Sequence, residues 1–131
     1  MDKTTEPLPA PIVYVVEHDS AVRDSLCLLL STAGIDSEAY DSAERFLESF
    51  NPDRIGCLVT EVDLPGLSGL DLLDRLRDLQ VELPTIVLAR HGDVGQAVRA
   101  VRSGALDYLE KPFVDRVLLR WIREVFGRAS S

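Results

Sequence analysis

Three short, almost uninterrupted apolar runs constrain the fold of this chain more than any other feature. They are IVYVV at 12–16, CLV at 57–59 and TIVL at 85–88. A strand reads as a continuous apolar run when both of its faces are covered, whereas a strand with one solvated face alternates. The runs therefore predict central strands of a parallel sheet with helices packed on both sides.

Helix-like segments separate these runs, so that strands and helices alternate along the chain. The spacing of apolar residues at three and four in the last segment predicts a helix with one buried stripe: Val114, Val117, Leu118, Trp121, Ile122 and Val125. Expected strands are 12–16, 37–40, 57–60, 85–89 and 105–109, and expected helices are 21–33, 42–50, 70–79, 94–103 and 114–126. This alternation predicts an α/β fold of five strand–helix pairs.

Small polar residues and glycines mark the ends of several expected helices. A short oxygen-bearing side chain can cap a helix by accepting hydrogen bonds from its free backbone amides. Suitable N-caps are Asp19 or Ser20 for the first helix, Ser42 for the second and Ser68 for the third. Gly34 and Gly104 are expected as C-caps.

Length and composition favour a single domain. The 131 residues are expected to form one domain at 12–126, between a flexible lead-in at 1–11 and a flexible tail or start of a linker at 127–131. No apolar run spans a bilayer and the N-terminus lacks secretory features, so we expect a cytoplasmic protein. The net charge of −8 opposes direct binding to nucleic acid. Cys27 and Cys57 lie in apolar segments and are expected to be buried, reduced thiols.

Charged residues follow the ends of the expected strands. The sequence EHD at 17–19 follows the first, Glu61 ends the third, Ala89 and Arg90 end the fourth, and EKP at 110–112 follows the fifth. Parallel strands bring their carboxyl ends to one edge, where ligands of such sheets bind. A candidate site is therefore expected at this edge.

Three longer stretches carry a resemblance to a known family. They are VYVVEHDSAVRDSL, LVTEVDLPGLSGLDLL and LARHGDVGQAVRAVRSGALDYLEKPF. Together they resemble the receiver domain of bacterial two-component response regulators, and its FixJ-like branch most closely, over about residues 12–126. The resemblance implies a flavodoxin-like, doubly wound (βα)5 domain with strand order 2-1-3-4-5. It also implies a signalling module that is not an enzyme.

A typical receiver takes a phosphoryl group onto an aspartate beside Mg²⁺, and this chain departs from that pattern. The family's phospho-acceptor position falls on Glu61, and its acidic pair falls on Glu17 and His18. The hydroxyl that reads the phosphoryl group falls on Ala89, which has none. The resemblance therefore covers the frame of the site but not its reactive groups.

The positions that match the family are the pocket lysine, Lys111, the proline that follows it, Pro112, and the aromatic switch position, Tyr108. We expect Glu61 to reach Lys111 and form an ion pair as a fixed charge. The space left by Ala89 leads to the hypothesis that Tyr108 rests permanently in the inward position of active receivers.

The departures predict weak phosphoryl chemistry. One extra methylene moves the carboxylate of Glu61 by up to roughly 1.5 Å, which spoils an in-line attack. An imidazole at His18 replaces an oxygen ligand, so Mg²⁺ binding is expected to be weak or absent, and no cofactor is expected. The leading interpretation is a degenerate receiver that acts through phosphorylation-independent protein interactions, with a possible role in transcription regulation.

Two other functions remain open at this point. One is a working phospho-acceptor for a histidine kinase, using Glu61, Asp63 or His18. The other is a metal-dependent hydrolase on a receiver frame, although no nucleophile with an adjacent base is evident. A site formed by Glu17, His18 and Glu61 has transition-metal chemistry, but an imidazole hydrogen-bonded to a carboxylate explains the same residues.

Several neighbouring residues also have two interpretations. Asp63 is expected to face outward, Asp19 either caps a helix or joins the pocket, and Arg90 is either solvated or reaches Glu61. The expected protein-binding face is formed by the fourth helix and fifth strand, and a solvated face is the alternative. Residues assigned to this face are Arg99, Arg102, Asp107 and Lys111.

The expected partners are a second copy of the chain, an output domain or a sensor histidine kinase. Neither a membrane nor nucleic acid is expected as a direct partner. FixJ-like relatives carry a C-terminal helix-turn-helix domain, so the chain is either a stand-alone receiver or a receiver that ends at a linker.

Overall fold

The five strands of the fold follow the predicted runs closely. The structure is a computed structural model, and it describes residues 10–113 and 115–130. Within these residues the strands are β1 Ile12–Val16, β2 Asp36–Tyr40, β3 Gly56–Glu61, β4 Thr85–Ala89 and β5 Asp107–Glu110. They form one parallel sheet in the order β2-β1-β3-β4-β5, which confirms the predicted fold and strand order.

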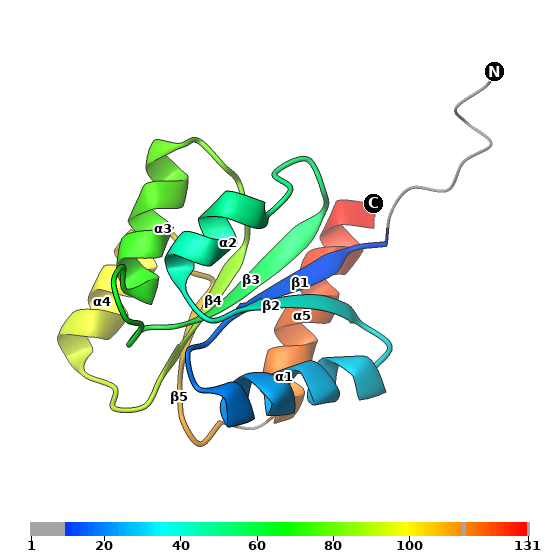
Figure 1. Ribbon diagram of the computed structural model, residues 1–131, viewed down its shortest axis with the longest axis horizontal. Coiled ribbons are helices and arrows are strands. Elements are labelled where there is room, and N and C mark those ends of the chain that lie inside the picture. Colours follow the sequence, from blue (N-terminus) through cyan, green and yellow to red (C-terminus); the bar gives the residue numbers. More distant parts are fainter. Residues whose placement is uncertain (1–9, 114, 131) are drawn as a thin grey trace.

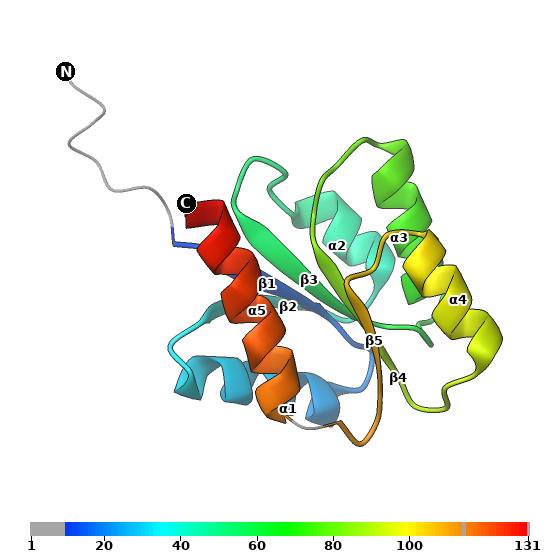
Figure 2. The ribbon, with the colours of Figure 1, turned by 180° about the vertical axis from the view of Figure 1, so that it is seen from behind.

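Helices cover both faces of this sheet. They are α1 Ser20–Thr32, α2 Ala43–Ser49, α3 Gly69–Asp78, α4 Val94–Arg102 and α5 Asp115–Ser130. Helices α1 and α5 lie on one face, and α2, α3 and α4 lie on the other (Figures 1 and 2). None of the helices in the described part of the chain has the length and apolar content needed to cross a membrane.

The core explains why the central strands read as continuous apolar runs. All residues of β1, β3 and β4 are buried. Alternate residues of β1 point to opposite faces: Val13 and Val15 pack against α1 and α5, whereas Tyr14 packs against Phe46 of α2 and Leu72 of α3. The sheet is therefore fixed from both sides, and its carboxyl edge is a rigid support for side chains.

The helix ends agree with most of the predicted caps. Asp19 is the N-cap of α1 and accepts from the amides of Ala21 and Val22. Ser42 and Ser68 cap α2 and α3 as predicted. The predicted C-caps were one residue late: Ala33 and Ser103 are the C-caps. The glycines that follow them, at 34 and 104, adopt the left-handed φ values of +75° and +96° that glycine tolerates best.

Two element boundaries differ from the prediction by more than one residue. The fifth strand was expected at 105–109, but β5 begins at Asp107, because the amide of Ala105 still donates to the carbonyl of Ala100 at the end of α4. The last helix was expected to end near Phe126, but α5 continues to Ser130. Its apolar stripe is confirmed for the residues described, while Val114 lies outside them, as do residues 1–9 of the expected lead-in and residue 131.

Both cysteines are free thiols. Cys57 is fully buried as predicted, and burial raises the pKa of its thiol to about 12. Cys27 is only half-buried, so the prediction that it is buried was wrong: the buried residues of α1 are Leu26 and Leu30.

Candidate functional site

Three charged side chains meet at the carboxyl end of the sheet. Glu17 follows β1, Glu61 ends β3, and Lys111 follows β5. Glu17 is 1% exposed and Glu61 is 0% exposed. Charges at this depth require partners, because the loss of hydration is otherwise too costly. The sheet topology therefore creates a site whose members must satisfy one another.

Lys111 bridges the two glutamates. Its Nζ lies 3.0 Å from Oε1 of Glu17 and 2.5 Å from Oε2 of Glu61. The backbone holds Lys111 in this place, because its amide donates to the carbonyl of Ala89 at the end of β4 (2.8 Å). A cis peptide bond joins Lys111 to the exposed Pro112. The ion pair between residues 61 and 111 is the one that the sequence predicted.

Glu17 is the better satisfied of the two carboxylates. Its Oε2 accepts from the amide of Asp19 (3.0 Å) and lies 3.3 Å from Nδ1 of His18. Burial alone would raise the pKa of Glu17. Hydrogen bonds from Glu61, from the amide of Asp19 and from Lys111 outweigh burial, so the pKa of Glu17 is lowered. Glu17 is therefore the carboxylate that keeps its charge.

Glu61 is less well satisfied. Its Oε1 is buried and has no hydrogen-bond partner within the described residues. The nearest cation is Arg90, whose Nε lies 3.7 Å from this oxygen, beyond hydrogen-bonding distance. Burial, together with the neighbouring Glu17, raises the pKa of Glu61 to about 7, although Lys111 opposes the shift. Glu61 therefore changes charge near neutral pH.

The mouth of the site is lined by both polar and apolar side chains. A cavity of about 430 Å³ is lined by His18, Asp63, Leu64, Pro65 and Arg90. Asp63 is exposed, as expected for a side chain beyond the strand end. Within residues 10–113 and 115–130, no three histidine, cysteine, aspartate or glutamate side chains are grouped so that they could hold a metal ion.

The loop after β3 is shaped by two glycines and a glutamate from α2. A Cβ on Gly69 would lie 2.1 Å from the carbonyl oxygen of Glu61, so only glycine allows α3 to start so close to the strand. Gly66 has φ +76°, and Glu44 accepts from the next amide, that of Leu67 (3.1 Å). These contacts keep the loop close to the end of β3.

The expected switch positions, Ala89 and Tyr108, lie on the face of the sheet that α3 and α4 cover. Ala89 is buried, and Tyr108 is half-buried against the same apolar cluster. The hydroxyl of Tyr108 donates to Oε1 of Gln96 in α4 (2.8 Å). The ring therefore packs toward the helix and does not point to solvent.

Helix α4 presents an apolar stripe to solvent. Val94, Val98 and Val101 are 81%, 43% and 66% exposed, whereas only Ala100 of this helix is fully buried. Arg99, which was expected on or near the face formed by α4 and β5, lies on this helix and is 46% exposed. Its guanidinium turns to α3, where Nη2 lies 2.9 Å from Asp71 and 3.0 Å from a second carboxylate, because the two acids there attract it.

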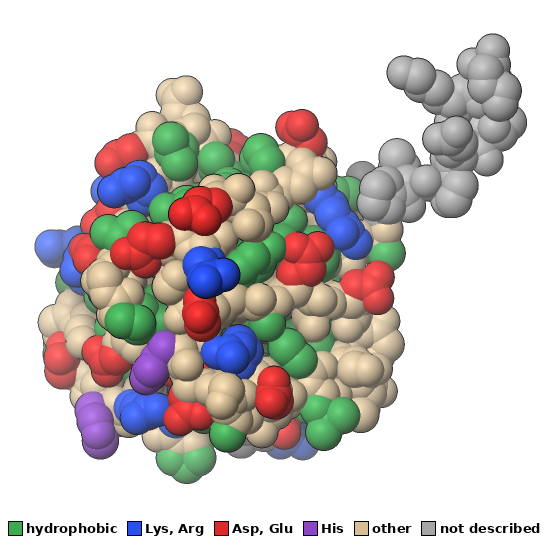
Figure 3. Space-filling model, in the orientation of Figure 1, with side chains coloured by type: hydrophobic (Ala, Val, Ile, Leu, Met, Phe, Trp, Pro, Cys, Tyr) green, Lys and Arg blue, Asp and Glu red, His purple; other side chains and the backbone are tan. Residues whose placement is uncertain are grey.

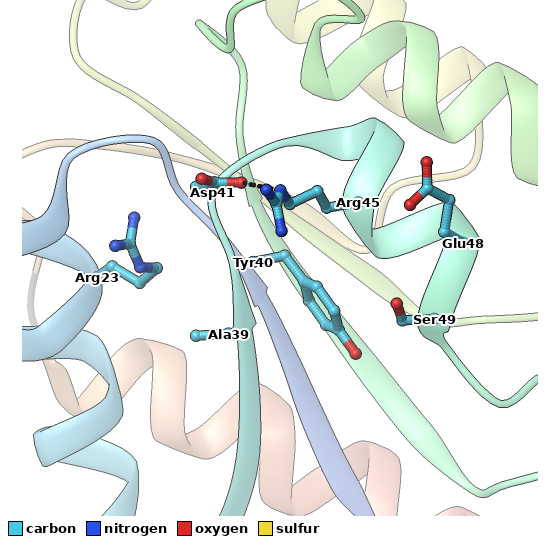
Figure 4. A pocket seen from close by; sticks show the side chains of 7 residues that line it. All are labelled: Arg23, Ala39, Tyr40, Asp41, Arg45, Glu48 and Ser49. Carbon is cyan, nitrogen blue, oxygen red and sulfur yellow. Dashed lines mark ion pairs between the residues drawn. The ribbon is translucent and has the colours of Figure 1, made fainter.

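A separate cavity of about 380 Å³ lies between α1 and α2 (Figure 4). Arg45 points toward Asp41, with 3.4 Å between Nε and Oδ1, and Arg23 donates to the carbonyl of Glu17 (2.8 Å). With Glu48 the cavity has two acids and two arginines and thus no excess charge. Charges of both signs are also interspersed over the face of the molecule shown in Figure 3.

Two contacts in the site region were not predicted from the sequence. Gln96 anchors Tyr108, and Glu110 accepts from the amide of Gly92 (3.1 Å) and so ties the loop after β4 to the end of β5. A glutamine on an exposed helical turn gives no signal in a sequence. Glu110 was recognised as a residue beyond a strand end, but its partner depends on the path of the loop.

Comparison with protein families identifies the class. The family model described as "Response regulator receiver domain" matches residues 13–123. The chain therefore belongs to the receiver domains of two-component response regulators, a family of signalling modules and not of catalytic enzymes.

Individual relatives place the chain near FixJ. It is 41% identical over 117 residues to the transcriptional regulatory protein FixJ of Bradyrhizobium diazoefficiens, which covers 89% of this chain and 57% of that protein. It is 45% identical over 115 residues to nodulation protein W of the same organism, with 88% and 51% covered. It is 38% identical over 114 residues to the response regulator protein TodT of Pseudomonas putida, with 87% and 50% covered. The chain thus spans about half the length of these curated relatives.

Solved structures agree with this placement. The crystal structure of FixJ-N has a TM-score of 0.82 and 40% identity, and the match covers 92% of this chain and 96% of that one. The response regulator StyR has a TM-score of 0.85 and 38% identity, with 91% and 60% covered. These matches confirm the flavodoxin-like receiver fold and the FixJ-like branch.

Proposed function

We propose that this chain is a degenerate receiver that signals through protein interactions without being phosphorylated. The observation that carries the proposal is the Lys111 bridge between Glu17 and Glu61. A phospho-accepting pocket needs a free carboxylate oxygen, a cation beside it and room for the incoming group. Here the lysine is already paired with both carboxylates, and both are buried.

The acceptor position supports this proposal. Oε2 of Glu61 is held by Lys111, and Oε1 faces no open solvent. Attack on a phosphoryl donor would require Glu61 to leave this ion pair and to approach in line. Its raised pKa also lowers the fraction of nucleophilic carboxylate near neutral pH.

We also propose that Mg²⁺ binds weakly or not at all. The fit of the residues to the ion is poor, because the ammonium of Lys111 lies between the carboxylates that would coordinate it. His18 contributes a nitrogen that contacts Glu17, and magnesium prefers oxygen ligands. No step in the proposed function depends on a metal ion.

The proposed output is constitutive. Ala89 has no hydroxyl to report a phosphoryl group, and Tyr108 is already tied to Gln96 in α4. We propose that this inward arrangement is the resting state of the chain, so that α4 is presented to partners at all times.

The proposed interaction surface is the valine stripe of α4, defined by Val94, Val98 and Val101. Exposed contiguous apolar side chains are typical of protein-binding sites. Receiver domains of two-component systems interact with histidine kinases and output domains. Because FixJ is a transcriptional regulatory protein, we propose a cytoplasmic role in transcription regulation, with an output domain or a second copy as the partner on α4.

The test compares the native chain with the triple variant Glu61→Asp, His18→Asp, Ala89→Thr. Each is incubated with acetyl phosphate and Mg²⁺, and the intact mass is measured. We expect no phosphoryl adduct on the native chain and an adduct on the triple variant, because the frame is retained. A stoichiometric adduct on the native chain would show a working receiver and would refute the proposal.

A further inference from the structure

We propose that Arg90 is a positioning residue that transmits the charge of Glu61 to the loop before α4, in place of the missing hydroxyl at Ala89. The inference rests on the proposed function, because it names how the same pocket controls the α4 surface. It concerns a coupling within the chain, so it is testable without a phosphoryl donor or a partner.

The contacts of Arg90 join three segments. The residue directly follows β4, its Nε lies 3.7 Å from Oε1 of Glu61, and its Nη2 lies 3.6 Å from Oδ2 of Asp19. Oε1 is the carboxylate oxygen for which the described part of the chain offers no hydrogen-bond partner. Arg90 is therefore the cation placed to balance that oxygen, and it links the ends of β1 and β3 to the loop.

Charge explains why this long ion pair matters. Lys111 is shared by two carboxylates, so the buried group of Glu17, Glu61 and Lys111 carries one excess negative charge when both acids are ionised. Arg90 is 44% exposed, but Glu61 is fully buried, and a pair with one buried member is screened less by solvent than a surface pair. The excess charge therefore attracts Arg90 and the loop that carries it.

The rest of the loop between β4 and α4 is hydrogen-bonded at its last two residues, so a restraint on Arg90 also restrains the start of α4. The amide of Gly92 donates to Glu110 (3.1 Å), and Asp93 caps the helix by accepting from the amide of Gln96 (2.7 Å). Val94, the first residue of α4 and of the valine stripe, follows directly. Arg90 thus fixes one end of a five-residue path from the pocket to the proposed interaction surface.

The experiment is a double-mutant cycle between Arg90→Gln and Glu61→Gln. Hydrogen exchange measured by mass spectrometry reports the opening of peptides that cover residues 90–102. We expect Arg90→Gln to speed exchange there by about three- to fivefold, as for loss of one partly exposed ion pair. In the Glu61→Gln background the same substitution is expected to change exchange little.

Two matched variants make the result specific. Arg90→Lys keeps the charge and is expected to restore most of the protection, which a merely space-filling role would not predict. Arg75→Gln removes an exposed arginine of α3 and is expected to leave residues 90–102 unchanged.

Equal acceleration by Arg90→Gln in both backgrounds, or no acceleration in either, would overturn the inference. Failure of Arg90→Lys to protect would also overturn it. These outcomes are independent of the acetyl phosphate test, because a chain that accepts phosphate still gives a definite result in the exchange cycle.

Discussion

The carboxyl-end pocket and the α4 surface differ in what they expose. In the pocket, two acids are almost completely buried and share one lysine. On α4, two valines are more than half exposed, although apolar side chains are usually buried in a fold of this size. The fold thus buries the charges of its carboxyl-end pocket and exposes apolar side chains on α4, which is the arrangement that the proposed function requires.

The two regions also contribute differently to stability. Buried charges depend on one another, so that removal of one partner leaves the others without compensation. Exposed valines lose little hydrophobic contact when they are changed. The predictions below test this difference, beginning with the largest expected effect.

Substitution of Lys111 by Met is expected to destabilise the fold most. It removes the ammonium group that the two glutamates share, and breaking a buried pair of this kind costs about 3–5 kcal/mol. Urea denaturation at pH 8 measures the effect. Arg102→Met, at an exposed position of α4, is the control. A loss no larger than that of the control would mean that the pocket does not depend on the bridge.

The substitution Glu61→Gln is expected to stabilise the chain at pH 8 and to flatten its pH dependence. The pKa of Glu61 is raised from 4.5 to about 7, so the folded state holds this proton more tightly than the unfolded chain. The free energy of unfolding of the native chain should therefore fall as pH rises through this window, by about 2–3 kcal/mol. Glutamine carries no charge to bury, so the variant should lose this slope.

The measurement is a set of denaturation curves between about pH 5.5 and pH 8. Glu17, whose pKa is lowered, contributes stability that is lost only at lower pH, below this window. Glu48→Gln changes an exposed glutamate and should leave the slope intact. A native chain that becomes more stable as pH rises to 8 would contradict the assigned burial of a charged Glu61.

Tyr108→Phe is expected to loosen α4 without disturbing the pocket. It removes the hydroxyl that donates to Gln96, and one such hydrogen bond contributes about 1 kcal/mol. Denaturation gives the loss of stability, and hydrogen exchange shows whether it is confined to α4. Tyr40→Phe, which removes an exposed contact with Glu38, is the matched control. Equal effects of the two variants would argue against a special role for the Tyr108 contact.

Val101→Ser is expected to have the smallest effect, within about 0.5 kcal/mol, because the side chain is 66% exposed. Val87→Ser makes the same chemical change in the buried β4 and should cost at least about 2 kcal/mol. Thermal unfolding of both variants provides the comparison. Similar losses would mean that the valine stripe is part of the core and not a free surface.

The sequence predicted the fold well because its strongest signals are local. The apolar runs of β1, β3 and β4 require cover on both faces, and few topologies provide it. The contact between Glu61 and Lys111 was also predictable, since parallel strands bring their ends together. The start of β5 was not predictable, because it depends on which residue is the last to donate a backbone hydrogen bond to a carbonyl of α4.

Side-chain direction was harder to predict than position. The sequence predicted that Glu17 lies at the site, but it did not predict the hydrogen bond from Lys111 to Glu17. That bond depends on the side-chain conformations of both residues, which their neighbours in the pocket determine. Arg99 lies on α4 as predicted and turns to Asp71, because the rotation of the helix brings the two together. Such choices are decided by packing across elements, which local patterns do not encode.

The most direct test of the central claim is a titration of the native chain with beryllofluoride, a phosphoryl mimic, in the presence of Mg²⁺, followed by amide NMR. The closed pocket predicts that the amides around Glu61 and Ala89 keep their positions, apart from shifts that the fluoride and magnesium salts cause alone. Saturable shifts at these amides that need both beryllium and magnesium would show that the pocket accepts the mimic, and would contradict the account.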